Sequence, residues 1–97
     1  MKNKLNAVNA LALQLHGGIP AADAFTFQSL REHIDEVQGL LAVKDPHWKD
    51  EVIDIIIHGY LLLGRYGVGS HEIRMIRRKR LKRFKEKIGE ALKEKEI

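Results

Sequence analysis

The sequence predicts a small all-α protein of four helices, and three observations lead to this prediction. Apolar residues recur at intervals of three to five along the 97-residue chain, as expected for helix faces that pack on a core. No segment has the alternation of a convincing strand. Short stretches containing Gly or Pro, near residues 17–20, 45–46 and 67–69, divide the chain into four segments. Short connections are typical of helix bundles, so we expect one all-α domain over residues 1–97.

The first two helices are expected over residues 2–16 and 22–43. The first is loosely amphipathic, and the Gly-Gly-Ile-Pro sequence at residues 17–20 is expected to end it. Phe25 and Phe27, near the start of the second helix, are expected to pack either on the first helix or on a partner subunit. The apolar face of the second helix consists of Leu30, Ile34, Val37, Leu40 and Leu41.

The third helix is expected to begin at Asp45-Pro46 and to reach about Tyr66. Asp is a good N-cap residue, and Pro fits the first helical position. Residues 52–63 are apolar on nearly all sides of this helix, so we expect burial in a core and against another copy of the chain. With a turn near Lys44, the second and third helices are expected to form an antiparallel hairpin.

The fourth helix is expected over about residues 70–95, with Ser70 as its cap and a frayed end beyond Gly89. It is strongly basic: residues 71–97 hold 11 Lys or Arg and 5 Glu, whereas residues 1–70 hold 6 basic and 8 acidic residues. This polarity fits an anionic partner, which could be nucleotide phosphate, nucleic acid or an acidic protein surface.

Composition excludes several other classes of protein. The chain has no Cys, which excludes disulfides and thiolate metal sites. The N-terminal run holds Asn, Gln and His residues and makes a poor signal peptide. The apolar stretch of residues 52–63 is too short to span a bilayer and is interrupted by Asp54 and His58. We therefore expect a cytoplasmic protein without a membrane partner.

Acidic residues at helical spacing predict a cation site. Glu32 and Asp35 lie one turn apart on the second helix, and Glu51 and Asp54 lie one turn apart on the third. In the expected hairpin Asp35 and Asp54 fall at similar heights. Glu32 and Glu51 match less well, so some of the four carboxylates could contact the cation directly and others only support those that do. Carboxylate oxygens are ligands that Mg²⁺ and Mn²⁺ prefer. Asp54 is expected to be buried among apolar residues, where a carboxylate needs a partner.

Structural roles would explain the same residues without a cation. Glu32 and Asp35 could be a solvated acidic pair on an exposed helix face. Asp54 could pair with an Arg or with His58, one turn further along the helix. A His beside a carboxylate is more often its hydrogen-bond partner than a metal ligand. His58 is therefore expected to hydrogen-bond to a carboxylate of the site and not to bind the cation itself. His47 is expected to be exposed and uninvolved.

The segment from Glu32 to Tyr66 resembles the MazG-like, all-α nucleoside triphosphate pyrophosphohydrolase superfamily. Its members carry the motif E-E-x-x-E on one helix and E-x-x-D on the next, and Glu51-Val52-Ile53-Asp54 matches the second motif. The spacing of His58 is similar to that of a His in the phosphoribosyl-ATP pyrophosphohydrolase branch. Two positions depart from the first motif, where Arg31 stands in place of the first Glu and Asp35 in place of the last.

The resemblance implies hydrolysis of a nucleoside triphosphate to a monophosphate and pyrophosphate, in a MazG-like four-helix bundle completed as a homodimer or homotetramer. It implies Mg²⁺ (or Mn²⁺) as the cofactor and Glu51 and Asp54 as catalytic residues. The implied metal ligands are Glu32, Asp35, Glu51 and Asp54. The residues implied to bind substrate phosphates are Lys79, Arg80 and Arg83.

A protein that binds without catalysis is the alternative. It would be a catalytically lapsed MazG-like helical dimer that binds nucleotide, nucleic acid or an acidic protein through its basic last helix. The run Arg77-Arg78-Lys79-Arg80 attracts phosphates without sequence specificity, although such a run alone is most often a solvated helix face. The sequence holds no Gly-rich phosphate loop, no Ser/His/Asp arrangement and no Glu-x-x-His pairs of a di-iron bundle.

Overall fold

The computed structural model describes residues 2–96, and these residues form four α-helices and no strand. The helices are α1 (Lys2–His16), α2 (Ile19–Ala42), α3 (Trp48–Arg65) and α4 (Ser70–Glu96). The predicted all-α class and the four helices are confirmed. The chain divides into two compact units, one that ends at Gly67 and one that begins at Val68, and each is described by itself.

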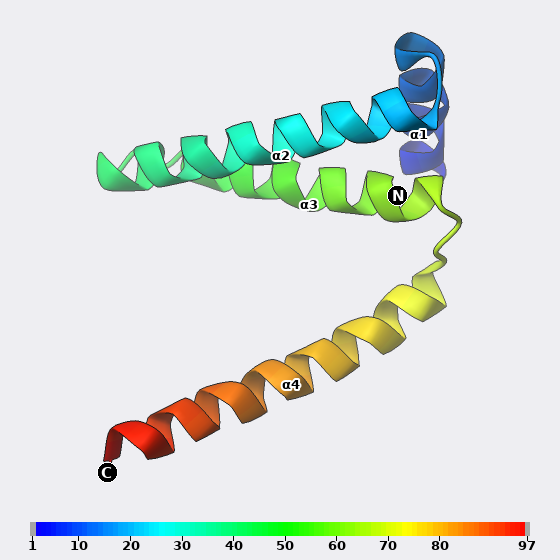
Figure 1. Cartoon of the computed structure of the whole chain (residues 1–97). Coiled ribbons are helices and arrows are strands. Elements are labelled where there is room, and N and C mark those ends of the chain that lie inside the picture. The colour runs from blue at the N-terminus through cyan, green and yellow to red at the C-terminus, as the bar shows by residue number, and fades with distance from the viewer. Residues whose placement is uncertain (1, 97) are drawn as a thin grey trace. The chain divides into compact units, whose positions relative to one another are not determined.

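The first unit is built on the pair α2 and α3, which lie side by side and make the most extensive contact between helices (Figure 1). A short turn joins them, so they run antiparallel, as the sequence predicted. α1 contacts both helices at the end of the pair where α2 begins and α3 ends (Figure 1). The free end of the pair carries the turn between α2 and α3.

α2 begins at Ile19, three residues before the predicted start. Gly17 and Gly18 take positive φ angles of 82° and 140°, which glycine tolerates better than other residues, and they separate α1 from α2. Pro20 then lies in the first turn of α2, where its missing N–H costs no hydrogen bond. The Gly-Gly-Ile-Pro sequence therefore both ends one helix and starts the next.

The turn after α2 ends that helix with a pair of backbone hydrogen bonds. Asp45 N–H donates to Leu40 O (2.9 Å) and Lys44 N–H donates to Leu41 O (3.1 Å). This pattern is the Schellman motif, which needs a left-handed residue, and here Lys44 takes φ 58° where Gly is usual. α3 begins at Trp48, two residues later than Pro46, because Asp45 Oδ1 accepts from His47 N–H (2.9 Å) in the turn before the helix.

The contact between α2 and α3 is rich in polar and small side chains. Ala22, Thr26 and Ser29 are buried on α2 at spacings of four and three, which places them on one face. Arg65, near the end of α3, forms an ion pair with Asp23, with Nε and Oδ1 3.1 Å apart, and donates from Nη2 to Thr26 Oγ1 (2.5 Å). A polar network therefore anchors the end of the pair that α1 contacts.

Apolar side chains of α3 lie on the outside of the single chain. Ile53 is 54% exposed and Ile56 is 47% exposed, whereas Leu61 is buried. A single copy of the chain therefore does not cover this helix on all sides, and its burial against another copy stays a prediction. The buried Asn9 of α1 donates from Nδ2 to Leu61 O (3.0 Å), and this hydrogen bond joins α1 to α3.

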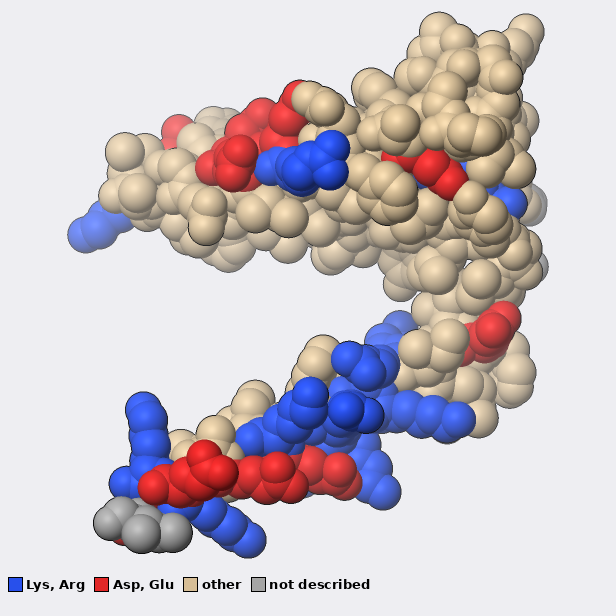
Figure 2. Space-filling model, viewed as in Figure 1, with Lys and Arg blue, Asp and Glu red and all other residues tan. Residues whose placement is uncertain are grey.

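The second unit is the long helix α4, which runs without a break through Gly89 to Glu96 and has no buried residue. Lys and Arg side chains cover much of its surface (Figure 2). Fraying beyond Gly89 stays a prediction for measurement in solution. Among residues 2–96, no helix has both the length and the apolar character needed to cross a membrane.

Candidate metal centre

Three side chains from α2 and α3 form a group suited to a metal ion near the turn that joins the two helices. His33 and Glu36 lie one turn apart on α2, and Glu51 lies in the first turn of α3. The antiparallel arrangement of the helices brings these positions together. Each residue offers one ligand atom, and these atoms lie within 4.8 Å of one another.

His33 makes the closest contact in this group. Its Nδ1 lies 2.5 Å from Glu51 Oε2 and 3.8 Å from Asp54 Oδ2. The side chains of His33 and Glu51 are 21% and 19% exposed, so both are partly shielded from water and still reachable from solvent. Asp54, one turn after Glu51 on α3, lies at the edge of the group. The arrangement offers one imidazole nitrogen and up to three carboxylates.

The two glutamates of the group interact with each other. A hydrogen bond to Glu51, together with the like charge of Glu51, raises the pKa of Glu36. The hydrogen bond from His33, followed by the one with Glu36, lowers the pKa of the Glu51 carboxyl. The group therefore favours an ionised Glu51 that accepts from its neighbours, with a proton retained on Glu36 to higher pH. A divalent cation could take the place of that proton, because it relieves the same repulsion between carboxylates.

Aromatic rings lie behind the group, on the side toward α1. The His58 ring lies 5.5 Å from the His33 ring and 6.5 Å from the Phe25 ring, centroid to centroid. The Phe25 ring in turn stacks on His16 at 4.6 Å. Burial lowers the pKa of His58, which favours its neutral form. Within the described residues, His58 Nδ1 has no hydrogen-bond partner, and His58 contacts the group through its ring, beside that of His33.

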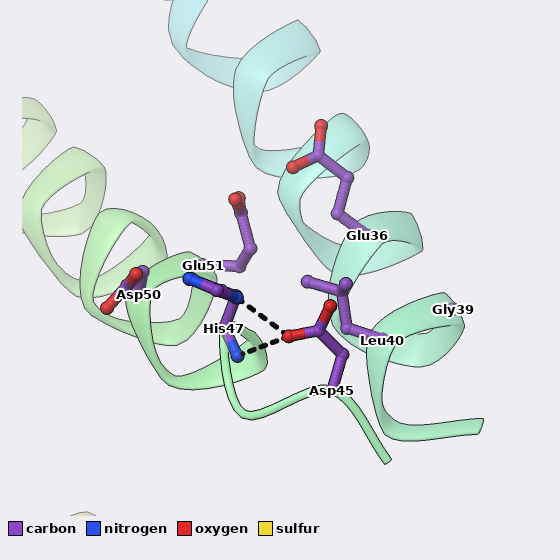
Figure 3. A pocket seen from close by; sticks show the side chains of 7 residues that line it. All are labelled: Glu36, Gly39, Leu40, Asp45, His47, Asp50 and Glu51. Carbon is purple, nitrogen blue, oxygen red and sulfur yellow. Dashed lines mark hydrogen bonds and ion pairs between the residues drawn. The ribbon is translucent and has the colours of Figure 1, made fainter. Parts of the chain in front are cut away.

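A depression beside the group opens at the turn (Figure 3). It has a volume of about 640 Å³, within the usual range of about 300–1,000 Å³ for small-molecule sites, and Glu36 and Glu51 lie at its rim. At the other rim Asp45 Oδ1 accepts from both His47 N–H (2.9 Å) and His47 Nδ1 (2.7 Å). These two bonds lower the pKa of Asp45, and the side-chain bond raises the pKa of His47. His47 is exposed at this rim, and its raised pKa favours the positively charged ring.

The residues predicted for the cation site differ in their distance from the group of His33, Glu36 and Glu51. Glu51 lies in the group, and Asp54 lies at its edge. The side chain of Asp54 is 46% exposed, so the prediction that it is buried is wrong. Glu32 is exposed and accepts a hydrogen bond from Gln28 at 3.0 Å, and Asp35 is also exposed. Within the described residues, neither of them belongs to the group that contains Glu51.

The predicted phosphate-binding residues lie on the second unit. Lys79, Arg80 and Arg83 are exposed on α4, where they line one shallow depression together with Ile76. The Arg80 guanidinium lies over the Phe84 ring, 5.3 Å from its centroid. These side chains therefore share one surface of α4.

Sequence reasoning missed His33 and Glu36. They have the same three-residue spacing as Glu32 and Asp35, one residue further along α2. The signal that could have found them is the row of small residues Ala22 and Ser29, because a close-packed face of α2 extended by four residues reaches His33. The pattern of acidic residues predicted the three-residue spacing of the site residues. Which residues of α2 point toward α3 depends on the face by which α2 packs.

No family model, curated protein or solved structure matches the chain. The fold and the site define an all-α chain with a candidate histidine–carboxylate metal centre between two antiparallel helices.

Proposed function

We propose that the chain is a divalent-metal-dependent nucleotide pyrophosphohydrolase with His33, Glu36, Glu51 and Asp54 as its metal-binding residues. The observation that carries the proposal is the convergence of His33, Glu36 and Glu51 within 4.8 Å across two helices. Four such groups on a rigid helix pair can hold a hard or borderline cation. The neighbouring depression has room for part of a nucleotide.

The ligand set favours Mn²⁺ over Mg²⁺. Mg²⁺ binds oxygen ligands almost exclusively, whereas Mn²⁺ accepts imidazole nitrogen together with carboxylates. The partial burial of His33 and Glu51 suits such a site, and a bound cation would relieve the repulsion between Glu36 and Glu51 that raises the pKa of Glu36. The Mg²⁺ expected from the sequence stays the second choice.

The new ligand set also supports the MazG-like resemblance in a shifted register. Glu32-His33-Ile34-Asp35-Glu36 has Glu at the first and last positions of E-E-x-x-E and His at the second. In this register Arg31 precedes the motif and does not replace a ligand. The pair His33 and Glu36 then faces the E-x-x-D motif of α3 with the three-residue spacing that both motifs share.

The proposed reaction adds one water to the bond between the α- and β-phosphates and yields a monophosphate and pyrophosphate. The cation, when bound, would polarise phosphate oxygens and favour ionisation of the attacking water. Glu51 and Asp54 would hold the cation and orient that water. His47 at the rim of the depression would stabilise negative charge on the substrate. Lys79, Arg80 and Arg83 stay proposed as phosphate-binding residues of the basic helix.

A second copy of the chain would cover the apolar surface that a single copy leaves in water. In addition to Ile53 and Ile56, the side chains of Phe25 (51%), Phe27 (46%) and Ile34 (48%) are exposed on the first unit. A homodimer or homotetramer would bury these side chains. Sedimentation at micromolar concentration should show a dimer or a larger species, and Ile56→Asp should shift it toward monomer. A natural chain that sediments as a monomer throughout that range would refute the proposed oligomer.

Pyrophosphate release from a panel of nucleotides tests the activity. The purified full chain should act on at least one member of a panel that includes pyrimidine deoxynucleotides and phosphoribosyl-ATP, with Mn²⁺ more effective than Mg²⁺. Glu36→Gln should abolish release, because it removes a ligand charge and keeps the side-chain shape. Asp35→Asn is the matched control: it removes the same charge one residue earlier on α2 and should leave release unchanged.

Three results would contradict the proposed site. Loss of activity in Asp35→Asn but not in Glu36→Gln would restore the ligand set first predicted from the sequence. Absence of release from every nucleotide with either metal would refute the enzyme and favour the lapsed relative. Activity that appears only in Arg31→Glu would identify Arg31 as the cause of that lapse.

Metal binding can be measured without turnover. At a concentration of Mn²⁺ about 100 times its Kd, binding to the folded state stabilises the protein by about 2.7 kcal/mol. For a protein of this size that corresponds to a rise in Tm of roughly 10–20 °C. His33→Ala should remove most of this rise, and a full rise in that variant would exclude His33 as a ligand.

A further inference from the structure

The segment of α4 from Arg74 to Lys87 is the most strongly basic part of the chain. It holds nine Lys or Arg and one Glu in 14 residues. No residue of α4 is buried. Among the described residues, no salt bridge includes a side chain of α4, and all four that are present lie in the first unit. Within α4 itself, these positive charges are therefore not compensated by its own glutamates.

The basic side chains form two rows along the helix. Arg74, Arg78, Lys82 and Lys85 follow one another at spacings of four, four and three, and we call these four residues the basic ridge. A second row, on another side of α4, consists of Lys79, Arg83 and Lys87. The basic ridge extends over 12 residues, with about 16 Å of helix between its first and last members, which matches about five phosphates of one strand at about 3.4 Å each.

We propose that α4 docks on duplex DNA through phosphate contacts from both rows. An α-helix with its side chains is about 10–12 Å wide and fits the major groove, which is about 12 Å wide. Rows on two sides of the helix would meet the phosphates of both strands. α4 contains no Asn or Gln, the side chains that read adenine best, so we expect no preference for adenine and a contact made mainly to phosphates.

The distribution of charge around α4 favours DNA over an anionic membrane surface. A helix that lies in a membrane interface needs a continuous apolar face opposite its basic face. On α4 the exposed apolar residues Leu81 and Phe84 share their side of the helix with Arg77 and Arg80. The Arg80 guanidinium lies directly over the Phe84 ring. Such a face inserts poorly into lipid, whereas a groove lined by phosphates accepts positive charge on every side.

Fluorescence anisotropy of labelled 25-base-pair duplexes tests the proposal with the full chain. Two duplexes of unrelated sequence should bind with Kd values within about threefold of each other. If six basic side chains contact phosphates, log K should fall with log salt at a slope of about −5, which weakens binding about 10³-fold between 50 and 200 mM salt. A strong preference for one sequence would overturn the phosphate-dominated contact.

Two fourfold variants with the same net charge locate the surface. Changing all four residues of the basic ridge to Gln should reduce the magnitude of the salt slope by about 3 to 4, at about 0.9 per lost contact. The control changes Lys4, Lys49, Lys93 and Lys95 to Gln, all of which are exposed and lie outside the basic segment. The control should keep the natural slope. Equal losses in the two variants would overturn the basic ridge as the binding surface.

Further measurements separate this proposal from its competitors. Vesicles with 30% anionic lipid should bind less tightly than DNA at equal salt, and tighter binding to vesicles would overturn the choice of partner. No binding to either duplex at 50 mM salt and 10 µM protein would refute the proposal outright. Glu36→Gln should bind DNA normally, because the proposed metal centre is not part of this surface. DNA binding and pyrophosphate release can therefore fail independently.

Discussion

Replacing Arg65 tests whether a buried ion pair holds the α2–α3 pair together. The Arg65 side chain is 2% exposed, and its partner Asp23 is 15% exposed. Their Nε and Oδ1 atoms lie 3.1 Å apart, and Tyr66 OH also donates to Asp23. Arg65→Met keeps much of the side-chain volume and leaves the Asp23 carboxylate in a shielded position without its cation.

The expected cost is large for so small a protein. At 3.1 Å and an effective dielectric constant of 20, the attraction between two unit charges is about 5 kcal/mol. Breaking a buried pair typically costs about 3–5 kcal/mol, because the remaining charge is left without compensation. The free energy of unfolding of a domain of this size is about 5–15 kcal/mol, so Arg65→Met should remove about a fifth of it or more.

Urea unfolding monitored by tryptophan fluorescence is the appropriate assay. Trp48 is the one Trp of the chain and begins α3, so its signal reports on the first unit and not on α4. Asp23→Leu should be destabilised as strongly as Arg65→Met. The double variant should recover most of the loss, because replacing a whole buried pair with apolar residues is often neutral. Lys49→Met, at an exposed position, is the control and should change the unfolding free energy by less than about 0.5 kcal/mol.

A double variant as unstable as the sum of its two parents would refute this reasoning. It would mean that the two residues act independently through packing and that their charges do not compensate each other. A loss below about 1 kcal/mol in Arg65→Met would refute it in a different way, by indicating that water reaches Asp23 and screens its charge.

Three further predictions concern turns and packing. Lys44→Gly should stabilise the protein by up to about 1 kcal/mol, because Lys44 has a left-handed φ of 58°; an unchanged urea midpoint would contradict this. Gly59→Ala should stabilise α3 by about 0.5–1 kcal/mol, since its new Cβ meets nothing within 4 Å. Gly64→Ala should stabilise it less, because its Cβ would lie 3.1 Å from an Asn side chain of α1. Equal gains in stability would show that α1 moves aside. The Asp45–His47 pair should stabilise the turn most between about pH 4 and 6.5. The pKa of Asp45 is lowered, so the stabilisation by Asp45 is lost as the pH falls. The pKa of His47 is raised, so the stabilisation by His47 is lost as the pH rises. A difference in Tm between the natural chain and Asp45→Asn that does not vary from pH 3 to 9 would contradict the last prediction.

The helices were predictable because their boundaries depend on local chemistry. Gly67 ends the third helical segment, and the Asp45-Pro46 sequence marks the turn before it, within two residues of the observed start. The start of α2 was missed because Gly17-Gly18 and Pro20 were interpreted as one loop. The same residues serve as a stop signal for one helix and a start signal for the next, and only the three-dimensional structure shows that no loop lies between them.

The three-residue spacing within the candidate site could be predicted from the sequence. The face of α2 on which the site lies could not. A helical repeat states which residues share a face, but it does not state which face meets the neighbouring helix. Glu32 with Asp35 and His33 with Glu36 have the same spacing and differ by one residue, or about 100° around α2. The phase is set by packing, because Ala22 and its small buried neighbours allow close approach to α3. The pattern of acidic residues alone does not indicate which face of α2 packs on α3.

The same reasoning explains why polar residues lie between the two helices and isoleucines lie outside. Where α2 and α3 meet, Arg65 lies beside Thr26 and Glu51 lies beside His33, whereas Ile53 and Ile56 are exposed. A chain organised in this way gains little from apolar burial between its own helices. Its stability therefore depends on the Arg65 network and on whatever covers the isoleucines. If a second copy covers them, the free energy of unfolding should rise with protein concentration, and a value independent of concentration would show that the first unit is stable by itself.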